Sequence, residues 1–522
     1  MKRIIITIFV LLAAMIAMAW LYFSRLNVQS SVDYTSLYAA STNSALVVSV
    51  ENDKNIHKIL QDQVLFENLL GEEKYNQLLS LKKNLIDLPS VNAYVEKQNF
   101  YFGFPPGNNK DINFLITTQL ATGKKSSTFF SLLKSNGIEL DSADQLLKIK
   151  LKDNSSYYLG MEKQLLLISN AAEPIKKAIA GLKDRSNHDF VEYIRANKRM
   201  STNTLACLHI NFKHFPALLK NIMPGKLSNE LEVLDNQPAF ATLTYNFSKE
   251  KLLFNGSTFI NDTQSYYNLF SESLPVDMNA AEILPEQTAN YVIYGIANYP
   301  EWKSGLDNWL KSRKENKAID QLMENVASKY RLDLKNIFTL SFNNQLITFQ
   351  MSNGERLGAI NVKNAPRFAQ LLLDISEDYS PNIKILKEPG ILYAFFGQPV
   401  EDFKRPYYSV IGNYMVFSNS GSAIRSFLEN YQGDKQLVNT QAYSDMNAQL
   451  PVGANISFYV DNDNSEPLFR RNIYLPFYRH IRDKKGLRNF SSMVYQLTGD
   501  KGKFQTNLLL ILKPDTPIQE NN

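Results

Sequence analysis

The stretch that decides the fold is residues 407–428, which read YYSVIGNYMVFSNSGSAIRSFL. Apolar residues lie on both sides of the turn pair Gly412 and Asn413, which predicts a tight hairpin. Apolar residues at helical spacing after Ser420 predict a helix. Residues 157–179 carry the same pattern with one residue inserted. A pattern that recurs at this distance is an internal repeat of domain size, so the sequence predicts a tandem duplication.

The repeat extends to both sides of this stretch. Each copy is expected to open with a strand and two helices, to continue with hairpins and further helices, and to close with a long hairpin. The segments expected in the first copy are 44–50, 53–65, 72–85, 100–104, 113–117, 127–134, 146–151, 157–161, 164–169, 205–212, 241–247 and 251–260. Those expected in the second are 289–296, 302–310, 319–330, 346–351, 357–362, 366–375, 383–386, 391–396, 455–460, 492–497 and 502–512, with 391–396 as a strand. In the closing hairpins Tyr245 and Phe254 align with Tyr495 and Phe504 at one constant offset.

The predicted fold class is α+β, because the strands follow one another in hairpins and do not alternate with helices. We expect a tandem duplication of an antiparallel-sheet-plus-helices domain behind one N-terminal transmembrane helix. The expected divisions are a cytoplasmic tip and anchor at 1–25, a polar linker at 26–36, a first repeat at 37–270, a second at 279–513 and a disordered tail at 514–522. Each repeat has the usual size of a domain.

The composition sets limits on the chemistry. The chain has 522 residues, 44% of them hydrophobic and 20% charged, which is enough to bury a large core. Cys207 is the single cysteine, so the chain can form neither an intrachain disulfide nor a four-thiolate metal site. A net charge of +5 over this length is mild and predicts no nucleic-acid partner. We expect no cofactor.

The N-terminus carries a membrane signal. Lys2 and Arg3 precede residues 4–23, from Ile4 to Phe23, which contain no charge. As a helix this run spans about 30 Å, the thickness of a bilayer core. Residues 17–19 (Ala-Met-Ala) offer a cleavage site, but the apolar run continues past them, which favours an uncleaved anchor. The positive-inside rule then places the N-terminus in the cytoplasm and the rest of the chain in the periplasm or outside the cell.

Three short motifs resemble catalytic or phosphate-binding signatures without completing them. Residues 123–126 (Gly-Lys-Lys-Ser) lack the first glycine of a phosphate-binding loop and the hydroxyl directly after its lysine. Ser131 and Lys134 have a serine-lysine spacing, but no companion motif follows. Cys207, His209 and Asn211 share one face of a predicted strand. Residues on one strand lie side by side, whereas a nucleophile and its base usually converge from different elements. We therefore expect no catalytic residues in this set, nor in the two incomplete motifs.

Residues 461–466 (Asp-Asn-Asp-Asn-Ser-Glu) resemble the start of a calcium loop, with oxygen-bearing side chains at alternate positions. Glu466 stands where such a loop has glycine, and Asn472 stands where it has glutamate. A polar turn at the end of a strand is therefore the default interpretation, weak surface calcium binding is the alternative, and we expect no metal site.

The strongest local charge feature is a basic segment at residues 470–488. It contains Arg470, Arg471, Arg479, Arg482, Lys484, Lys485 and Arg488. Asp483 is the one acid among them, and Tyr474, Phe477 and Tyr478 are interleaved. Such a segment can bind anionic lipid head groups or an acidic envelope polymer, and the alternative is a solvated basic surface. The corresponding segment of the first repeat is charge-balanced, so we expect function where the repeats differ.

The chain resembles an uncharacterised family of membrane-anchored bacterial proteins, catalogued as domain of unknown function 3352. The residues that carry the resemblance are 284–289 (Leu-Pro-Glu-Gln-Thr-Ala), Tyr407, Tyr408, 416–418 (Val-Phe-Ser) and 422–424 (Ser-Ala-Ile), together with the N-terminal apolar segment. Residues 41–44 (Ser-Thr-Asn-Ser) depart from the expected Leu-Pro opening in the first repeat. The family has no assigned activity, so the resemblance implies no functional residues.

These observations lead to one expected function and two alternatives. We expect a membrane-anchored extracytoplasmic protein that binds or scaffolds something in the bacterial envelope without catalysis. The first alternative is an envelope hydrolase whose site is assembled from distant residues. The second is a carrier of a hydrophobic ligand, held in a cleft between the repeats.

Overall fold

The computed structural model describes residues 34–51, 64–107, 112–143, 146–184, 187–197, 205–224, 239–246, 248, 250–260, 262 and 264–513. The expected anchor at 4–23 and the expected tail at 514–522 lie outside these residues. None of the helices in the described ranges has both the length and the apolar character needed to cross a bilayer.

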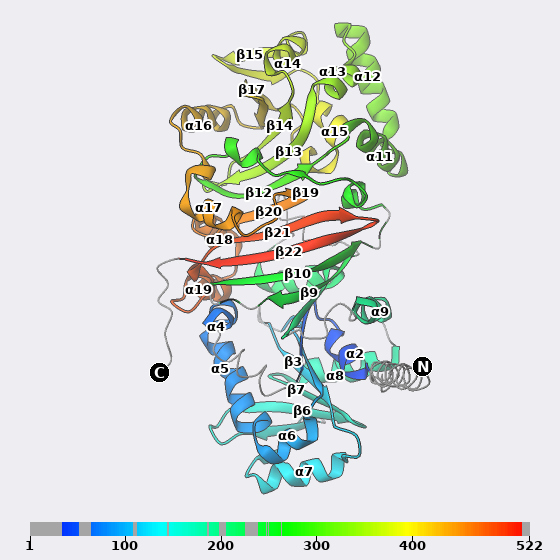
Figure 1. Ribbon diagram of the computed structural model, residues 1–522, viewed down its shortest axis with the longest axis vertical. Helices are drawn as coiled ribbons and strands as arrows, with labels where there is room; N and C mark the ends of the chain where they lie inside the picture. Colours follow the sequence, from blue (N-terminus) through cyan, green and yellow to red (C-terminus); the bar gives the residue numbers. More distant parts are fainter. Residues whose placement is uncertain are drawn as a thin grey trace, which may run out of the picture.

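The described chain is built on one antiparallel sheet of 20 strands, which runs along the long axis of the molecule (Figure 1). From one edge to the other the strands are β4 (Glu139–Ala143), β5 (Leu146–Lys150), β6 (Ser156–Glu162), β7 (Leu165–Ser169), β3 (Leu115–Gln119), β2 (Asn99–Gly103), β1 (Leu46–Glu51), β8 (Cys207–Asn211), β9 (Ala239–Asn246), β10 (Lys251–Ile260), β22 (Lys503–Leu512), β21 (Phe490–Asp500), β20 (Ile456–Asp461), β12 (Thr288–Gly295), β13 (Phe342–Met351), β14 (Arg356–Val362), β18 (Tyr414–Ser418), β17 (Tyr407–Ile411), β16 (Ile383–Leu386) and β15 (Ser376–Ser380). A separate two-stranded sheet pairs β11 (Val276–Asp277) with β19 (Gly453–Ala454). The predicted α+β class is confirmed.

Helices cover both faces of the sheet. The described α-helices are α2 (Thr35–Ser41), α4 (Val64–Leu70), α5 (Glu72–Leu81), α6 (Pro89–Val95), α7 (Ser126–Ser135), α8 (Ala172–Asp184), α9 (His188–Asn197), α10 (Phe215–Ile222), α11 (Tyr299–Ser312), α12 (Asn316–Tyr330), α13 (Leu334–Ser341), α14 (Ala365–Leu371), α15 (Ile391–Phe396), α16 (Gly421–Gln432), α17 (Gln441–Asn447), α18 (Glu466–Asn472) and α19 (Leu475–Arg482). Side-chain caps fix several of their starts; for example, Asn298 accepts from the backbone N–H of Glu301 at the start of α11.

The stretch at 407–428 folds as predicted. Strands β17 and β18 form a hairpin, and α16 follows it. Ser420 caps the helix by accepting from the backbone N–H of Ala423, 3.2 Å away. Successive residues of β18 point to opposite faces, so Met415 and Phe417 join one core cluster while Val416 joins another. The hairpin of β6 and β7 with α8 takes the same form in the first half.

One predicted strand is wrong, because residues 391–396 form helix α15. Five of its six side chains are buried, so the segment contacts the core all round and its periodicity could not distinguish a strand from a helix. Gly390 and Gly397 bound it with φ of 81° and 69°, a region that favours glycine. The expected linker at 26–36 also ends earlier than predicted, because α2 begins at Thr35.

The two halves of the sheet meet where β10 pairs with β22 over eight residue pairs, which we call the seam. One hydrophobic cluster crosses it and includes Tyr245 and Phe254 from the first half and Phe504 from the second. Beneath the seam the hydroxyl of Thr258 lies 3.0 Å from that of Tyr495 and 2.7 Å from that of Thr506, and all three residues are buried. The halves therefore share backbone hydrogen bonds, buried polar contacts and one core.

Counted outwards from the seam, the two halves have the same strand order. Strand β9 corresponds to β21, β8 to β20, β1 to β12 and β2 to β13. The correspondence continues to the edges, where β4 matches β15. Each half also places its central hairpin, β6–β7 or β17–β18, at the same position in this order.

Candidate functional site

The basic segment at 470–488 folds into α18, α19 and the 3₁₀ turn Leu487–Asn489, beside α4 (Figure 1). Six of the seven predicted cationic residues are exposed, and Lys485 is half-buried. Helix α19 is amphipathic, with Ile481 buried and Phe477 and Tyr478 partly buried on one side, while Arg479 and Arg482 are exposed on the other together with Leu475. The structure therefore brings the predicted residues together on one side of the molecule.

Part of this segment joins the two halves. The Nζ of Lys485 lies 3.0 Å from a carboxylate oxygen of Glu67 and 3.0 Å from one of Glu72, and these acids raise the pKa of Lys485. Asn489 donates to the Oδ1 of Asn68 at 2.8 Å, and a ring nitrogen of His480 lies 3.2 Å from the carbonyl oxygen of Leu69. The contact partners belong to α4 and to the first residue of α5, so the segment docks onto the first half.

The remaining cations divide into two groups. Arg482 pairs with Glu466 at 3.3 Å, and Arg471 and Arg488 donate to backbone carbonyls at 3.2 and 3.4 Å. The side chains of Arg470, Arg479 and Lys484 are exposed and make no hydrogen bond or ion pair with any other described residue. These three, which we call the free cations, are the part of the segment available to an anionic partner.

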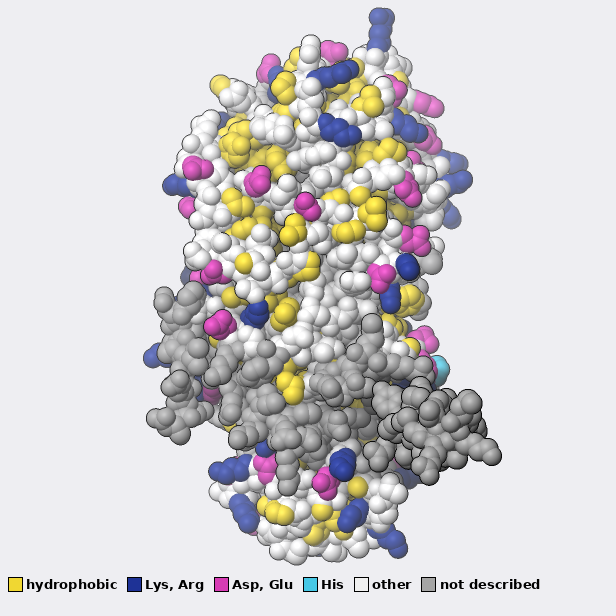
Figure 2. Space-filling view, in the orientation of Figure 1, with side chains coloured by type: hydrophobic (Ala, Val, Ile, Leu, Met, Phe, Trp, Pro, Cys, Tyr) yellow, Lys and Arg dark blue, Asp and Glu magenta, His cyan; other side chains and the backbone are white. Residues whose placement is uncertain are grey.

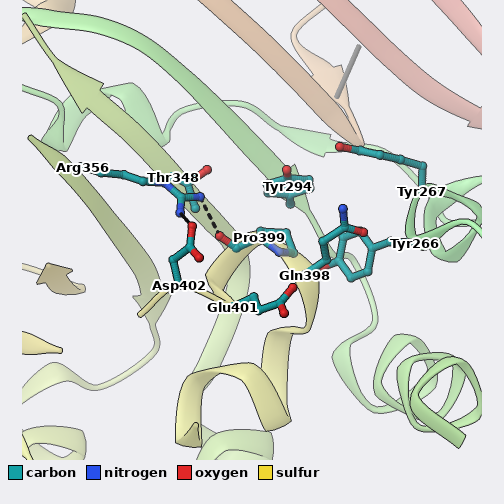
Figure 3. Close-up of a pocket in the computed structure, with 9 residues that line it drawn as sticks. All are labelled: Tyr266, Tyr267, Tyr294, Thr348, Arg356, Gln398, Pro399, Glu401 and Asp402. Carbon is teal, nitrogen blue, oxygen red and sulfur yellow. Dashed lines mark hydrogen bonds and ion pairs between the residues drawn. The ribbon is translucent and has the colours of Figure 1, made fainter. Parts of the chain in front are cut away.

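A small polar pocket lies where the 3₁₀ helix Tyr266–Phe270, at the end of the first half, approaches β12, β13 and β14 of the second (Figure 3). Its volume is about 50 Å³. The lining residues are Tyr266, Tyr267, Tyr294, Thr348, Arg356, Gln398, Pro399, Glu401 and Asp402. A cavity of this size holds about three water molecules and excludes a lipid chain or a sugar.

Arg356 closes one side of this pocket. Its guanidinium donates to a carboxylate oxygen of Asp402 at 3.0 Å and to the carbonyl of Pro399 at 3.0 Å, and it lies 4.9 Å from the ring centre of Phe403. Figure 3 shows Thr348 beside this guanidinium, with Tyr266 and Tyr267 across the pocket. The hydroxyl of Thr348 is fully buried and meets no hydrogen-bond partner among the described residues. A bound water is the simplest group that satisfies it.

The central strands present a third feature, an uncharged polar surface on the side of the sheet away from the shared core. Two rows of residues run directly across β9, β10, β22 and β21. They are Thr244, Asn255, Asn507 and Gln496 in one row and Thr242, Ser257, Gln505 and Thr498 in the next. We call these eight residues the amide face. Figure 2 shows the middle of this side as a mainly white band, with charged side chains towards its borders.

The predicted Cys-His-Asn set stays on one strand and does not converge. His209 is only 4% exposed. Its two ring nitrogens lie 2.9 Å from the hydroxyl of Ser49 and 3.2 Å from that of Thr242, on the strands to either side. The imidazole therefore forms a cross-strand link between hydroxyls, and Cys207 lies two cross-strand pairs away along β8.

The acidic turn at 461–466 uses its side chains internally. The Oδ1 of Asp461 accepts from the backbone N–H of Asn464 at 2.8 Å, and Asp463 pairs with Lys513 at 2.6 Å. Asn464 donates to the carbonyl of Glu286 at 2.7 Å. Burial raises the pKa of Asp461, which disfavours the charged form that a cation needs. Among the residues that the structure describes, no three His, Cys, Asp or Glu side chains cluster in a way that would hold a metal ion.

The two remaining motifs lie at helix α7. Lys124 lies over the ring of Tyr94, 4.9 Å from its centre, immediately before the helix. Ser131 lies inside the helix and donates to the carbonyl of Ser127 at 3.4 Å, so its hydroxyl serves the helix backbone.

The pocket and the amide face were not predicted from the sequence. Alternating Thr, Asn and Ser in residues 242–246 and 255–257 was the available signal for the face.

No protein-family profile matches the sequence, and no curated protein matches it. The resemblance to the family of unknown function 3352 therefore stays a prediction. Among solved structures, the chain is similar to the one titled "Structure of crystal form IV of TP0453", with 12% sequence identity and a TM-score of 0.22 over 43% of this chain and 80% of that chain. A TM-score of this size supports no conclusion about fold or function.

Proposed function

We propose that this chain is a single-pass membrane protein of the bacterial envelope, with its N-terminus in the cytoplasm and its bulk outside, and that it binds or scaffolds a partner there without catalysis. The location is supported by the uncharged run at 4–23 behind Lys2 and Arg3. The run lies outside the described residues, so the proposed membrane anchor rests on the length of the run and on the charges beside it.

The observation that carries the scaffold role is the seam. Strand β10 pairs with β22 over eight residue pairs, and one core cluster continues through it. A hydrogen-bonded sheet resists bending at such a join, so surfaces on the two halves keep a fixed separation. A protein that holds partners at set positions needs this rigidity. A carrier needs a cleft between the halves, and the described residues fill that position with paired strands, which favours the scaffold.

We also propose that the two halves arose by tandem duplication. Support comes from the matching strand order on each side of the seam and from the repeated hairpin-and-helix pattern at 157–179 and 407–428. The halves differ in charge, because the second carries the basic segment at 470–488 and the segment after β8 in the first is balanced.

Crosslinking in intact cells tests the binding role. A photoreactive side chain placed at exposed Ser444 on α17 is expected to capture one predominant envelope protein or polymer. The matched control places the same group at Ser131 on α7, at the end of the first half, whereas α17 lies near the middle of the molecule (Figure 1). A scaffold gives a discrete product that depends on position. Diffuse capture that is identical at both positions would argue against it.

A second candidate is attachment to an anionic surface through the free cations. Each basic residue near an anionic membrane contributes about 1 kcal/mol, so three together raise the partition coefficient about a hundredfold. Vesicle sedimentation with anionic and neutral lipids measures it. We expect Arg470→Gln, Arg479→Gln and Lys484→Gln together to abolish the preference for anionic vesicles.

The control for this experiment removes the same charge elsewhere. Lys134, Lys163 and Lys176 are exposed in the first half. Their combined change to Gln is expected to leave the preference for anionic vesicles in place. If both triple variants bind anionic vesicles equally, attachment through the free cations is ruled out.

A further inference from the structure

The amide face contains no charged residue at any of its eight positions. It lies back to back with the shared core, because residues that alternate with it, such as Leu252 and Phe254, point into that core. Thr244, Asn255 and Asn507 are partly exposed and Gln505 is exposed. Gln496 and Ser257 are buried, at 2% and 9% exposure, so the part of the face that is open to a ligand is formed by Thr244, Asn255, Asn507 and Gln505.

The amides of this face are already ordered by one another. The side-chain N–H of Asn246 donates to the Oδ1 of Asn255, and that of Asn255 donates to the Oδ1 of Asn507. The side-chain N–H of Asn507 donates in turn to the Oε1 of Gln496 at 3.5 Å. Gln496 in turn donates to the carbonyl of Pro451 at 3.2 Å. A side-chain amide has two donor hydrogens and two acceptor lone pairs. In Asn255 and in Asn507, these bonds use one donor hydrogen and one oxygen lone pair. Each of the two amides therefore retains one donor hydrogen and one lone pair.

An aromatic platform borders this face. Phe259 is 38% exposed and lies two residues beyond Ser257 on β10. Tyr193 of α9 stacks on it, with ring centres 6.3 Å apart and planes 19° apart. The hydroxyl of Tyr193 donates to the carbonyl of Ser257 at 2.8 Å, which fixes the ring at the end of the polar rows. Burial raises the pKa of Tyr193 to about 12, so this hydroxyl stays a neutral donor.

We propose that the amide face binds an uncharged, hydroxyl-rich polysaccharide. The eight positions offer a charged ligand no counter-charge, and the next row, beside Phe259, holds one acid and one base, Asp500 and Lys503, which pair directly across the hairpin. An apolar ligand would leave the amides and hydroxyls unpaired, which costs about 1–3 kcal/mol per group. Sugar hydroxyls act as donor and acceptor at once and match the free positions of Asn255 and Asn507. The apolar C–H side of a sugar ring suits the exposed ring of Phe259.

The dimensions of the face suit a short oligosaccharide. Four strands at a spacing of about 4.8 Å make it about 14 Å wide. The two halves of the chain contribute equally, because β9 and β10 belong to the first and β22 and β21 to the second. The face is therefore complete only when the seam is formed. This binding activity goes beyond scaffolding and does not depend on the membrane anchor.

Titration calorimetry with the full chain tests the proposal. The chain is kept in a detergent without a sugar head group, and the probes are cellohexaose and chitohexaose, with polyglutamate as a charged comparison. We expect saturable binding of at least one neutral hexasaccharide and none of polyglutamate. Asn507→Ala and Thr244→Val are each expected to raise the Kd at least tenfold. Thr244→Val keeps the branched shape of the side chain, so the sheet should stay intact.

Asn343→Ala is the matched control. Asn343 donates to the Oδ1 of Asn361 at 2.7 Å on β13 and β14, so the variant also loses a bond between amides, far from the amide face. We expect its Kd to equal that of the parent chain. The proposal is overturned if neither hexasaccharide binds, if the three variants change binding equally, or if the protein binds only polyglutamate.

Discussion

Arg356 illustrates how a single residue in this fold combines a charge with buried contacts. Its side chain is 15% exposed, whereas that of its partner Asp402 is 69% exposed. An ion pair with one exposed partner contributes less than about 1 kcal/mol. The bond from the guanidinium to the carbonyl of Pro399 and its packing on Phe403 are shielded from water, so they should contribute more.

We therefore expect Arg356→Met to lower the free energy of unfolding by about 2–3 kcal/mol, because a buried carbonyl loses its charged donor. Asp402→Asn should lower it by less than about 1 kcal/mol. Chemical denaturation of both variants measures the difference. Equal losses would mean that the ion pair, and not the buried contact, dominates.

His214 makes the stability of the folded protein depend on pH. Burial, and then the nearby Lys213, lower its pKa in the folded state. The unfolded chain then takes up a proton first as the pH falls below about 6.5, the ordinary value for histidine. The contribution of neutral His214 to the free energy of unfolding is fully present above that pH. On acidification it falls by up to about 1.4 kcal/mol per pH unit, until the pH drops below the pKa of His214 in the folded state. His214→Gln should remove this part of the slope between pH 7 and 5 in thermal melts.

At the scale of elements, α15 depends on the two glycines that bound it. A Cβ on Gly397 would lie 2.8 Å from Leu306 and 3.0 Å from Tyr266, at a φ of 69°. A Cβ on Gly390 would meet only Leu322 at 3.9 Å, at a φ of 81°. Gly390 has a left-handed helical conformation, which costs a non-glycine residue about 1–2 kcal/mol. Gly397 has φ of 69° and ψ of −143°, a region that is essentially restricted to glycine, and its substitution also adds steric overlap.

Gly397→Ala is accordingly expected to destabilise the protein by about 3 kcal/mol and Gly390→Ala by about 1 kcal/mol. Urea denaturation of the two variants compares them directly. The explanation of α15 fails if Gly390→Ala proves the more harmful change.

Some strands and helices could be predicted from the sequence and others could not. Hairpins with clear turn residues, such as β17–β18, were predicted correctly because alternation and a Gly-Asn turn agree. Residues 391–396 were misassigned because a short, wholly apolar run has no period. The constant sequence offset between the closing hairpins does not extend to their cross-strand pairing, because Tyr245 pairs with Phe254 whereas Tyr495 pairs with Leu508.

The candidate sites were harder to predict than the strands. Clustering of the basic residues followed from their proximity in sequence, but the separation of Lys485 from the free cations depends on Glu67 and Glu72, more than 400 residues earlier. The amide face depends on strands from both halves meeting at the seam. Neither long-range pairing leaves a local signal in the sequence.

At the scale of the whole molecule, the shared core predicts that the two halves unfold together. Trp302 and Trp309 report on the second half, and hydrogen exchange of β3 and β7 reports on the first. Phe504→Ala removes a fully buried ring at the seam and should cost about 3–5 kcal/mol. We expect it to shift both probes by the same amount. Two separate transitions, with the first half unaffected, would show that the seam does not couple the halves.

Thiol labelling in spheroplasts tests the proposed location of the folded part of the chain outside the cytoplasm. The chain has one cysteine, so a Cys207→Ser background can carry a single new thiol at exposed Ser131, at exposed Ser444 or at Lys2. A membrane-impermeant maleimide should label Ser131→Cys and Ser444→Cys in intact spheroplasts and should label Lys2→Cys only after lysis. Labelling of the first two variants only after lysis would contradict the account.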